Sequence, residues 1–158
     1  MERIQDLETG TPTIAIVAHD AKKEELLGLL VDFLPKLADC QMVATQTTGT
    51  LVAQRLGLPV RLLQSGPMGG DQQVGALVAE GKLDAVVFLR DPLTAQPHEP
   101  DISALLRVCD VHNVPLATNR ATARALLSQL FSGKCTRAAE GLPQGALRGK
   151  NQEVAAWN

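Results

Sequence analysis

Six acidic or imidazole side chains of this 158-residue chain follow short apolar runs, where an enzyme could use them to move protons. Carboxylates and imidazoles are the usual general acids and bases of proteins. They stand at no spacing typical of metal ligands, so the pattern favours acid–base chemistry that needs no metal. The six residues are His19, Asp20, Asp71, Asp91, His98 and Asp101.

Hydroxyl groups, a glycine and one lysine follow the same apolar runs and predict a phosphate-binding site. Hydroxyls and the amides at a helix N-terminus donate hydrogen bonds to phosphate, and the helix dipole favours an anion there. A glycine lets a ligand approach the backbone, and a lysine adds a positive charge. The candidates are Lys23, then Thr45, Gln46, Thr47 and Thr48, and finally Ser65 and Gly66.

Simpler roles remain open for several of these residues. Thr47 and Thr48 would favour the start of a helix in any protein, and Asp71 and Asp101 stand where helix N-caps are expected. His98 lies in a proline-rich loop, where an exposed histidine is the usual finding. The conjunction of acid–base groups with phosphate-binding groups therefore carries more weight than any single residue.

Short apolar runs alternate with longer amphipathic ones along the chain. Uninterrupted apolar runs are typical of strands buried on both faces, and apolar residues three or four apart are typical of helices. Strands are predicted over 13–18, 41–45, 60–63, 85–89 and 115–118, and helices over 22–37, 50–56, 72–80, 102–112 and 121–130. This order predicts an α/β fold with a single open, five-stranded parallel sheet and helices on both faces, a three-layer Rossmann-type arrangement. Such sheets bind ligands outside the carboxyl ends of their strands, where the candidate residues fall.

The composition is that of one globular domain. Hydrophobic residues make up 45% of the chain and charged residues 20%, and the formal net charge of −2 gives no reason to expect a nucleic acid or membrane partner. The first residues are polar, no apolar run approaches the roughly 20 residues of a membrane span, and the three cysteines form no CxxC pair. We expect a soluble, cytoplasmic protein with its domain at 13–131, an extension at 1–12 and an irregular tail at 132–158.

The segment SGPMGGDQQVG at residues 65–75 resembles the signature of the methylglyoxal synthase family. Further motifs follow in the same order as in that family: VAHD at 17–20, ATQTTG at 44–49, RDPL at 90–93, PHEPD at 97–101 and PLATN at 115–119. The resemblance covers about residues 14–122. It implies a lyase that converts dihydroxyacetone phosphate to methylglyoxal and inorganic phosphate without metal or organic cofactor. It also implies a homohexamer that phosphate inhibits allosterically.

The resemblance further implies a role for each candidate residue. Asp71 matches the base that removes a proton beside the ketone, His98 matches the group that polarises the substrate oxygens, and His19 also lies on the substrate. The supporting carboxylates of the family correspond to Asp20, Asp91 and Asp101. The positions that bind phosphate correspond to Lys23, Thr45, Thr47, Thr48, Ser65 and Gly66.

Two features depart from the family pattern. The family has glycine at the position of Gln46. A side chain there would perturb the loop and the affinity for phosphate if this residue needs a positive φ or backbone contact with the phosphate. The segment after residue 130 does not match the family's usual carboxyl end. The arginine with which the family reaches a neighbouring subunit's site is therefore assigned to no residue here, neither Arg137 nor Arg148.

A non-catalytic regulatory domain is the main alternative, because the same fold senses effectors in carbamoyl phosphate synthetase. Such a domain would keep the phosphate-binding residues and dispense with the proton-transfer groups. The presence of Asp71, His98 and Asp101 favours the enzyme. A phosphatase of the doubly wound class would need a nucleophile or a metal site, and no aspartate pair or cysteine loop has the spacing for one.

Overall fold

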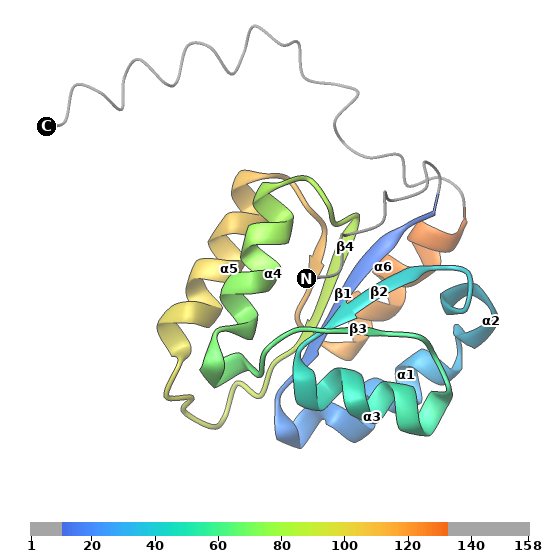
Figure 1. The fold of residues 1–158 in the computed structure, drawn as a ribbon, viewed down its shortest axis with the longest axis horizontal. Helices are drawn as coiled ribbons and strands as arrows, with labels where there is room; N and C mark the ends of the chain where they lie inside the picture. The colour runs from blue at the N-terminus through green and yellow to red at the C-terminus, as the bar shows by residue number, and fades with distance from the viewer. Residues whose placement is uncertain (1–10, 133–158) are drawn as a thin grey trace, which may run out of the picture.

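The computed structural model describes residues 11–132, and its centre is a five-stranded sheet in which all strands are parallel (Figure 1). The sheet order is β3-β2-β1-β4-β5. The predicted α/β fold is confirmed. The predicted extension and tail lie outside the described residues, apart from Thr11, Pro12 and Ser132. The strands are β1 (Thr13–Ala18), β2 (Gln41–Ala44), β3 (Arg61–Leu62), β4 (Ala85–Leu89) and β5 (Leu116–Ala117).

Helices cover both faces of the sheet and complete three layers (Figure 1). One face carries α1 (Lys23–Val31), α2 (Leu34–Leu37), α3 (Gln46–Leu56) and α6 (Arg120–Phe131). The other face carries α4 (Gly70–Ala79) and α5 (Glu99–Val111). This arrangement is the doubly covered sheet that the alternation of apolar and amphipathic runs predicts.

Strand β1 divides the hydrophobic core in two because successive side chains of a strand point to opposite faces. Ile14 and Ile16 belong to the cluster beneath α1, α3 and α6, whereas Ala15 and Val17 belong to the cluster beneath α4 and α5. Every residue of β1 and of β4 is buried. The two strands pair along their lengths, so they form the rigid middle of the sheet, from which the loops at their carboxyl ends project.

The start of α3 differs from the predicted range. The helix begins at Gln46, four residues earlier than predicted, and Thr45 occupies its N-cap position. Thr47 and Thr48 therefore lie within the first turn rather than ahead of the helix. Gln46 has helical backbone, and Asn113 is the non-glycine residue with positive φ in the described part of the chain. The backbone at position 46 therefore does not require glycine for its φ, and the expected effect of this side chain on backbone contact with phosphate stays a prediction.

The helix caps predicted at Asp71 and Asp101 are wrong. The N-cap positions belong to Gly69 and His98, and both aspartates lie inside the first turn of their helices, α4 and α5. Gly69 has φ 102°, a left-handed conformation that glycine adopts without strain. This backbone turn starts α4 two residues earlier than predicted, so the carboxylate of Asp71 does not cap the helix.

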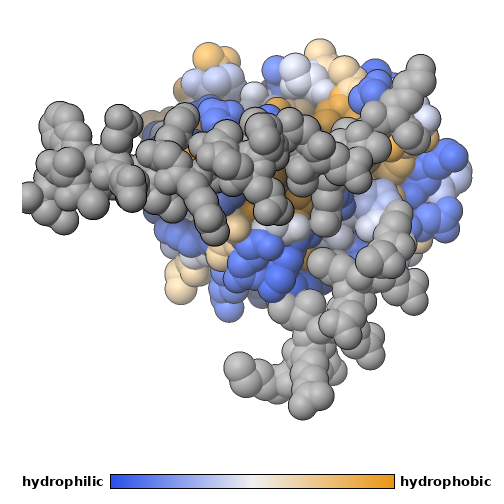
Figure 2. Space-filling view, turned by 90° about the horizontal axis from the view of Figure 1, so that it is seen from above, coloured by the Kyte–Doolittle hydropathy of each residue, from blue (hydrophilic) through white to orange (hydrophobic). Residues whose placement is uncertain are grey.

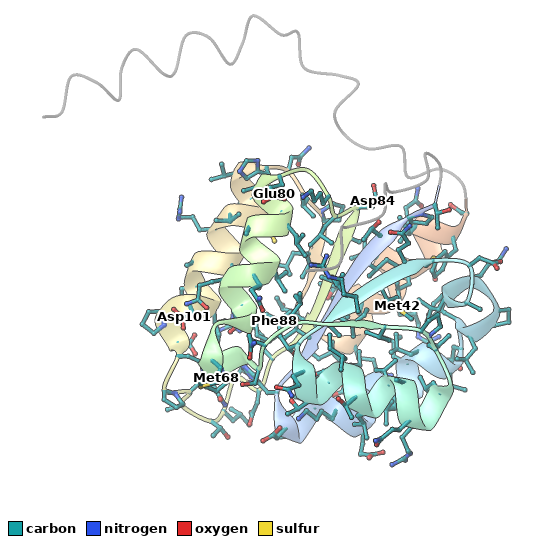
Figure 3. All side chains as sticks on the ribbon, in the orientation of Figure 1. Met42, Met68, Glu80, Asp84, Phe88 and Asp101 are labelled. Atoms are coloured by element: carbon teal, nitrogen blue, oxygen red, sulfur yellow. The ribbon has the colours of Figure 1, made fainter. Side chains whose placement is uncertain are left out.

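The surface of residues 11–132 carries few large apolar side chains, and these are dispersed. In the view of Figure 2, hydrophilic and hydrophobic residues are interspersed. Figure 3 separates the two ends of the sheet: Glu80 and Asp84 lie at the amino end of β4, and Met68 and Asp101 lie at the opposite end. None of the helices described is long and apolar enough to cross a membrane. The exposed large apolar residues are Val31, Leu62, Met68, Leu93 and Val111.

Gly70 permits a close approach between α4 and the segment that follows β3. A Cβ atom at this position would overlap the carbonyl oxygen of Gln64 and would lie 2.9 Å from Cγ2 of Thr45. The first turn of α4 therefore rests directly on the backbone of its neighbours. This contact fixes the helix end that carries Asp71.

Replacing Gly70 by alanine should destabilise the fold, because the clash is with backbone that cannot move aside. We expect the free energy of unfolding to fall by about 1–3 kcal/mol, the usual effect of overpacking. Gly75→Ala is the matched control: it lies in the same helix, and its Cβ would meet nothing within 4 Å. The control should gain about 0.5–1 kcal/mol from helix propensity. Urea unfolding measures the free energy of unfolding of both variants. Equal values for Gly70→Ala and Gly75→Ala would show that the close approach at Gly70 does not contribute to stability.

Candidate active site

The carboxylate of Asp71 is buried at the start of α4. Its residue is 1% exposed, and among the described residues neither carboxylate oxygen has a hydrogen-bond partner. Burial without partners disfavours the charged form and raises the pKa of Asp71; His98 opposes this shift, and Asp101 adds to it. A carboxylate in this state accepts a proton more readily than one in water.

His98 faces this carboxylate from the loop before α5. Its Nε2 lies 3.6 Å from Oδ2 of Asp71, and its side chain is 12% exposed. Its Nδ1 is buried and has no hydrogen-bond partner within the described range. Asp71 comes from the first turn of α4 and His98 from the N-cap of α5, so the fold, and not sequence proximity, brings them together.

Gly66 keeps space open in front of this pair. A Cβ atom at position 66 would lie 3.1 Å from Nε2 of His98 and 3.5 Å from Oδ2 of Asp71. Any side chain there would therefore crowd the facing atoms of His98 and Asp71. Ser65 precedes it as the N-cap residue of the 3-10 turn Gly66–Met68.

His19 approaches the same place from the end of β1. Its Nδ1 accepts the backbone N–H of Asp91 at 2.9 Å, and its ring meets the ring of His98 edge to face with centroids 6.1 Å apart. The ring also rests edge to face on Phe88, at 5.2 Å. Burial is the largest cause that lowers the pKa of His19, and His98 and Arg90 lower it further. The imidazole is therefore neutral at neutral pH.

A lysine and a hydroxyl lie at the outer side of these groups. Nζ of Lys23 donates to Oγ1 of Thr47 at 3.0 Å and to Oδ1 of Asp20 at 2.5 Å. The bond from Lys23 lowers the pKa of Asp20, which projects into solvent. Lys23 and Thr47 thus form a cationic, hydrogen-bonding corner at the N-terminus of α3, as the predicted phosphate site requires.

The other residues of the threonine segment have different positions. Thr48 is buried and donates to the carbonyl oxygen of Ala18 at 3.3 Å, and Thr45 is buried with its hydroxyl 3.4 Å from that of Thr48. These two hydroxyls tie α3 to the end of β1. Gln46 is exposed, and its backbone N–H donates to the carbonyl of Gln64, which places it beside the Ser65 loop.

The supporting aspartates are not equivalent in the structure. Asp101 acts on Asp71 through its charge. The carboxylate of Asp91 accepts the N–H of Leu93 at 3.1 Å, so this group bonds to its own loop. Asp20 pairs with Lys23. The structure therefore gathers Asp71, His98 and His19 closely and places these three carboxylates around them.

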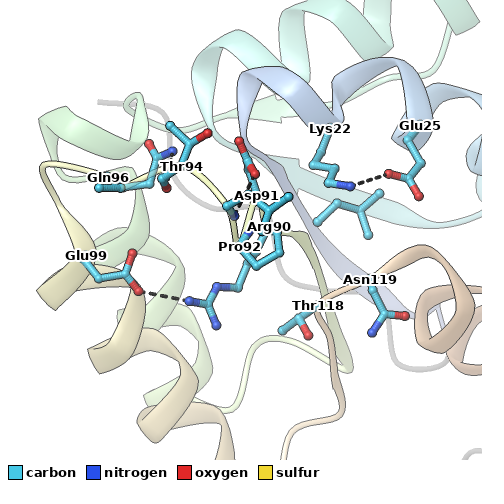
Figure 4. A pocket seen from close by; sticks show the side chains of 13 residues that line it. Lys22, Glu25, Arg90, Asp91, Pro92, Thr94, Gln96, Glu99, Thr118 and Asn119 are labelled. Atoms are coloured by element: carbon cyan, nitrogen blue, oxygen red, sulfur yellow. Dashed lines mark hydrogen bonds and ion pairs between the residues drawn. The ribbon is translucent and has the colours of Figure 1, made fainter.

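Sequence reasoning did not assign a role to Arg90 and Glu99. Nη2 of Arg90 pairs with Oε1 of Glu99 at 3.0 Å and joins the end of β4 to the first residue of α5 (Figure 4). The pair lines a pocket of about 650 Å³, on whose other side Lys22 pairs with Glu25 at 3.1 Å. The signals for them were the position of Arg90 directly after a strand and the motifs RDPL at 90–93 and PHEPD at 97–101.

Comparison with known proteins places this chain in a family. A family model described as an MGS-like domain matches residues 29–118. A methylglyoxal synthase from Burkholderia thailandensis is 59% identical over 121 residues, which are 77% of this chain and 93% of the relative. The chain belongs to the methylglyoxal synthase family. A second member of the family, from Burkholderia lata, is 60% identical over 119 residues, 75% of this chain and 92% of its own.

A solved structure supports the same assignment. The crystal structure of methylglyoxal synthase from Elizabethkingia anophelis NUHP1 superposes with a TM-score of 0.71 at 45% sequence identity. The match covers 75% of this chain and 78% of that one. The methylglyoxal synthase family thus accounts for both the fold and the order of the loops that carry the site.

The burial of Asp71 predicts a pH-dependent stability difference. Because the folded state raises this pKa, it binds the proton more tightly than the unfolded state, and the carboxyl progressively destabilises the fold as pH rises above about 4. Asp71→Asn removes the charge, so at pH 7 the variant should be more stable than the parent, by on the order of 1 kcal/mol. Urea unfolding at pH 4 and pH 7 measures the difference, which should shrink at the lower pH. A difference independent of pH would contradict the assigned burial effect.

Proposed function

We propose that this methylglyoxal synthase family member carries out its reaction at the site formed by Asp71, His98 and His19. The chain is a carbon–oxygen lyase that acts on dihydroxyacetone phosphate and yields methylglyoxal and inorganic phosphate. The single observation that carries the site assignment is the buried carboxylate of Asp71, which has no hydrogen-bond partner in the described chain and faces Nε2 of His98 at 3.6 Å.

Proton removal is the first step. Asp71 takes a proton from the hydroxymethyl carbon beside the ketone, and the electron pair of that carbon–hydrogen bond forms the carbon–carbon double bond of an enediolate. A carboxylate in water is a weak base for such a carbon acid, and burial raises the pKa of Asp71 towards a better match. The buried position of the base thus contributes directly to the chemistry.

The oxygens of the enediolate need hydrogen-bond donors as their negative charge develops. His98 and His19 are the two donors at hand, since their rings meet edge to face with Asp71 beside them. Donors that are held in place before the reaction stabilise a developing charge without having to reorganise. The packing of His19 on Phe88 serves this purpose.

Loss of phosphate completes the reaction. The enediolate pushes out the neighbouring carbon–oxygen bond, phosphate leaves with the bonding electrons, and the resulting enol becomes methylglyoxal by moving a proton from oxygen to carbon. The departing bond must stand out of the enediolate plane to overlap its π system. We assign the holding of phosphate in this orientation to Lys23, Thr47 and the amides of the Ser65–Gly66 segment.

A non-catalytic sensing domain would require only the phosphate corner at Lys23 and Thr47. It would gain nothing from a carboxylate whose burial destabilises the fold. Asp71 therefore favours the enzyme over the sensor. Assembly as a homohexamer is a proposal that rests on the family resemblance. A cytoplasmic location and domain boundaries at 13 and 131 are proposals that rest on the composition and on the pattern of apolar runs.

Activity of the Asp71→Asn variant tests the base directly. We expect the parent chain to release methylglyoxal and phosphate in equal amounts from dihydroxyacetone phosphate in the presence of a chelator. The variant should lose about 10²–10⁴-fold or more in kcat, the range for a general base. Asp110→Asn, an exposed change on the far end of α5, is the control and should keep full activity. Full activity of Asp71→Asn would rule out Asp71 as the base.

Two adjacent lysines test the phosphate corner. Lys23→Gln should raise KM for dihydroxyacetone phosphate and weaken inhibition by inorganic phosphate, each roughly 10–100-fold, because one charge-assisted hydrogen bond is worth about 1.5–3 kcal/mol. Lys22→Gln is the control: it makes the same chemical change in a lysine that pairs with Glu25 and lines the pocket beside Arg90 and Glu99. Steady-state kinetics of both variants should differ sharply. Equal effects would mean that position 23 acts only through net charge.

A further inference from the structure

The backbone and the side chain of Asp91 each make a hydrogen bond to another residue. Its backbone N–H donates to Nδ1 of His19 at 2.9 Å, and its carboxylate accepts the backbone N–H of Leu93 at 3.1 Å. Hydrogen bonds to Thr94 and then to Leu93 lower the pKa of this carboxyl. The side chain therefore closes a turn over residues 91–94, and the backbone of the same residue holds a histidine of the active site.

The bond to Nδ1 determines the protonation state of His19. A ring nitrogen that accepts an N–H hydrogen bond carries a lone pair, so the proton of the neutral ring is on Nε2. Protonating Nδ1 would set its hydrogen against that of the Asp91 amide and lose the bond. Nε2 itself is buried and has no hydrogen-bond partner among residues 11–132. The ring is thus held as a neutral donor with its N–H unused.

We propose that Asp91 is a positioning residue: its carboxylate holds the 91–94 turn so that its own amide fixes His19 as a neutral Nε2–H donor to a substrate oxygen. This inference rests on the proposed function. It differs from a role for Asp91 as an active-site carboxylate, because the carboxylate acts on Leu93 and Thr94 and reaches the chemistry only through the backbone. The side chain matters for the turn that it closes, and its charge is incidental.

The turn and the charge of Asp91 affect His19 in opposite directions. Burial, His98 and Arg90 lower the pKa of His19, whereas the charges of Asp91 and Glu99 raise it. Removing the negative charge of Asp91 alone would therefore lower that pKa further. Releasing the amide from Nδ1 would raise it, because protonation would no longer break a hydrogen bond. The sign of the change separates the two roles.

Two substitutions at Asp91 form a matched pair. Asn and Ala both remove the charge, but the amide oxygen of Asn can still accept the N–H of Leu93 and keep the turn. We expect the pKa of His19 to be higher in Asp91→Ala than in Asp91→Asn, with Nδ1 protonated in the alanine variant at a pH where it stays unprotonated in the asparagine variant. Nitrogen-15 NMR of labelled histidines measures this in the free protein. The chain has three histidines, so His112→Gln helps to assign the signals.

Kinetics give the second readout. Misplacing the His19 donor should weaken its hydrogen bond to the transition state more than its hydrogen bond to the bound substrate. We therefore expect kcat of Asp91→Ala to be about tenfold below that of Asp91→Asn, with little difference in KM. Equal His19 pKa values and equal kcat in the two variants would overturn the proposal. The NMR result needs no turnover. A failure of the lyase assignment, which Asp71→Asn tests, is therefore distinguishable from a failure of this one.

Discussion

The burial of one unpaired carboxylate is the constraint on which the rest of this structure depends. Taking a charged group out of water without hydrogen bonds destabilises a fold, and such groups persist only where the surroundings hold them in place. For Asp71 the surroundings are the left-handed Gly69, the contact of Gly70 with the Gln64 carbonyl, and the apolar cluster beneath α4 and α5. Burial of the two hydrophobic clusters offsets the unfavourable free energy of burying this charge.

Rigidity and reactivity are divided between the strands and the loops. β1 and β4 are buried along their whole lengths and pair with each other, and His19 and Arg90 directly follow them. Because the sheet is parallel, each strand delivers its following loop to the same edge. Small displacements of a loop would change the distance between donors and substrate, and the strands prevent the loop origins from moving.

The sequence predicted the elements better than their ends. The apolar runs at β1 and β4 are short and uninterrupted, as is typical of strands buried on both faces, and the structure buries every residue of both. The start of α4 could not be predicted, because it depends on the left-handed φ of Gly69. For this reason the cap expected at Asp71 is wrong. The link between Asp91 and His19 was equally out of reach: a backbone amide donates to the ring, and no residue type signals that. Asp71 and His98 were singled out from motifs, but their 3.6 Å separation required the fold.

The ion pair between Lys23 and Asp20 has a consequence for the end of the catalytic cycle. In the empty site the lysine already has a neutralising partner. On the proposed assignment, product phosphate brings about two negative charges to a corner that holds one positive and one negative charge. The occupied site is therefore electrically unbalanced, and Asp20 repels the anion that Lys23 attracts. Lys23 without Asp20 would bind product phosphate more tightly. The carboxylate of Asp20 weakens this binding and therefore favours release of phosphate before the next substrate binds.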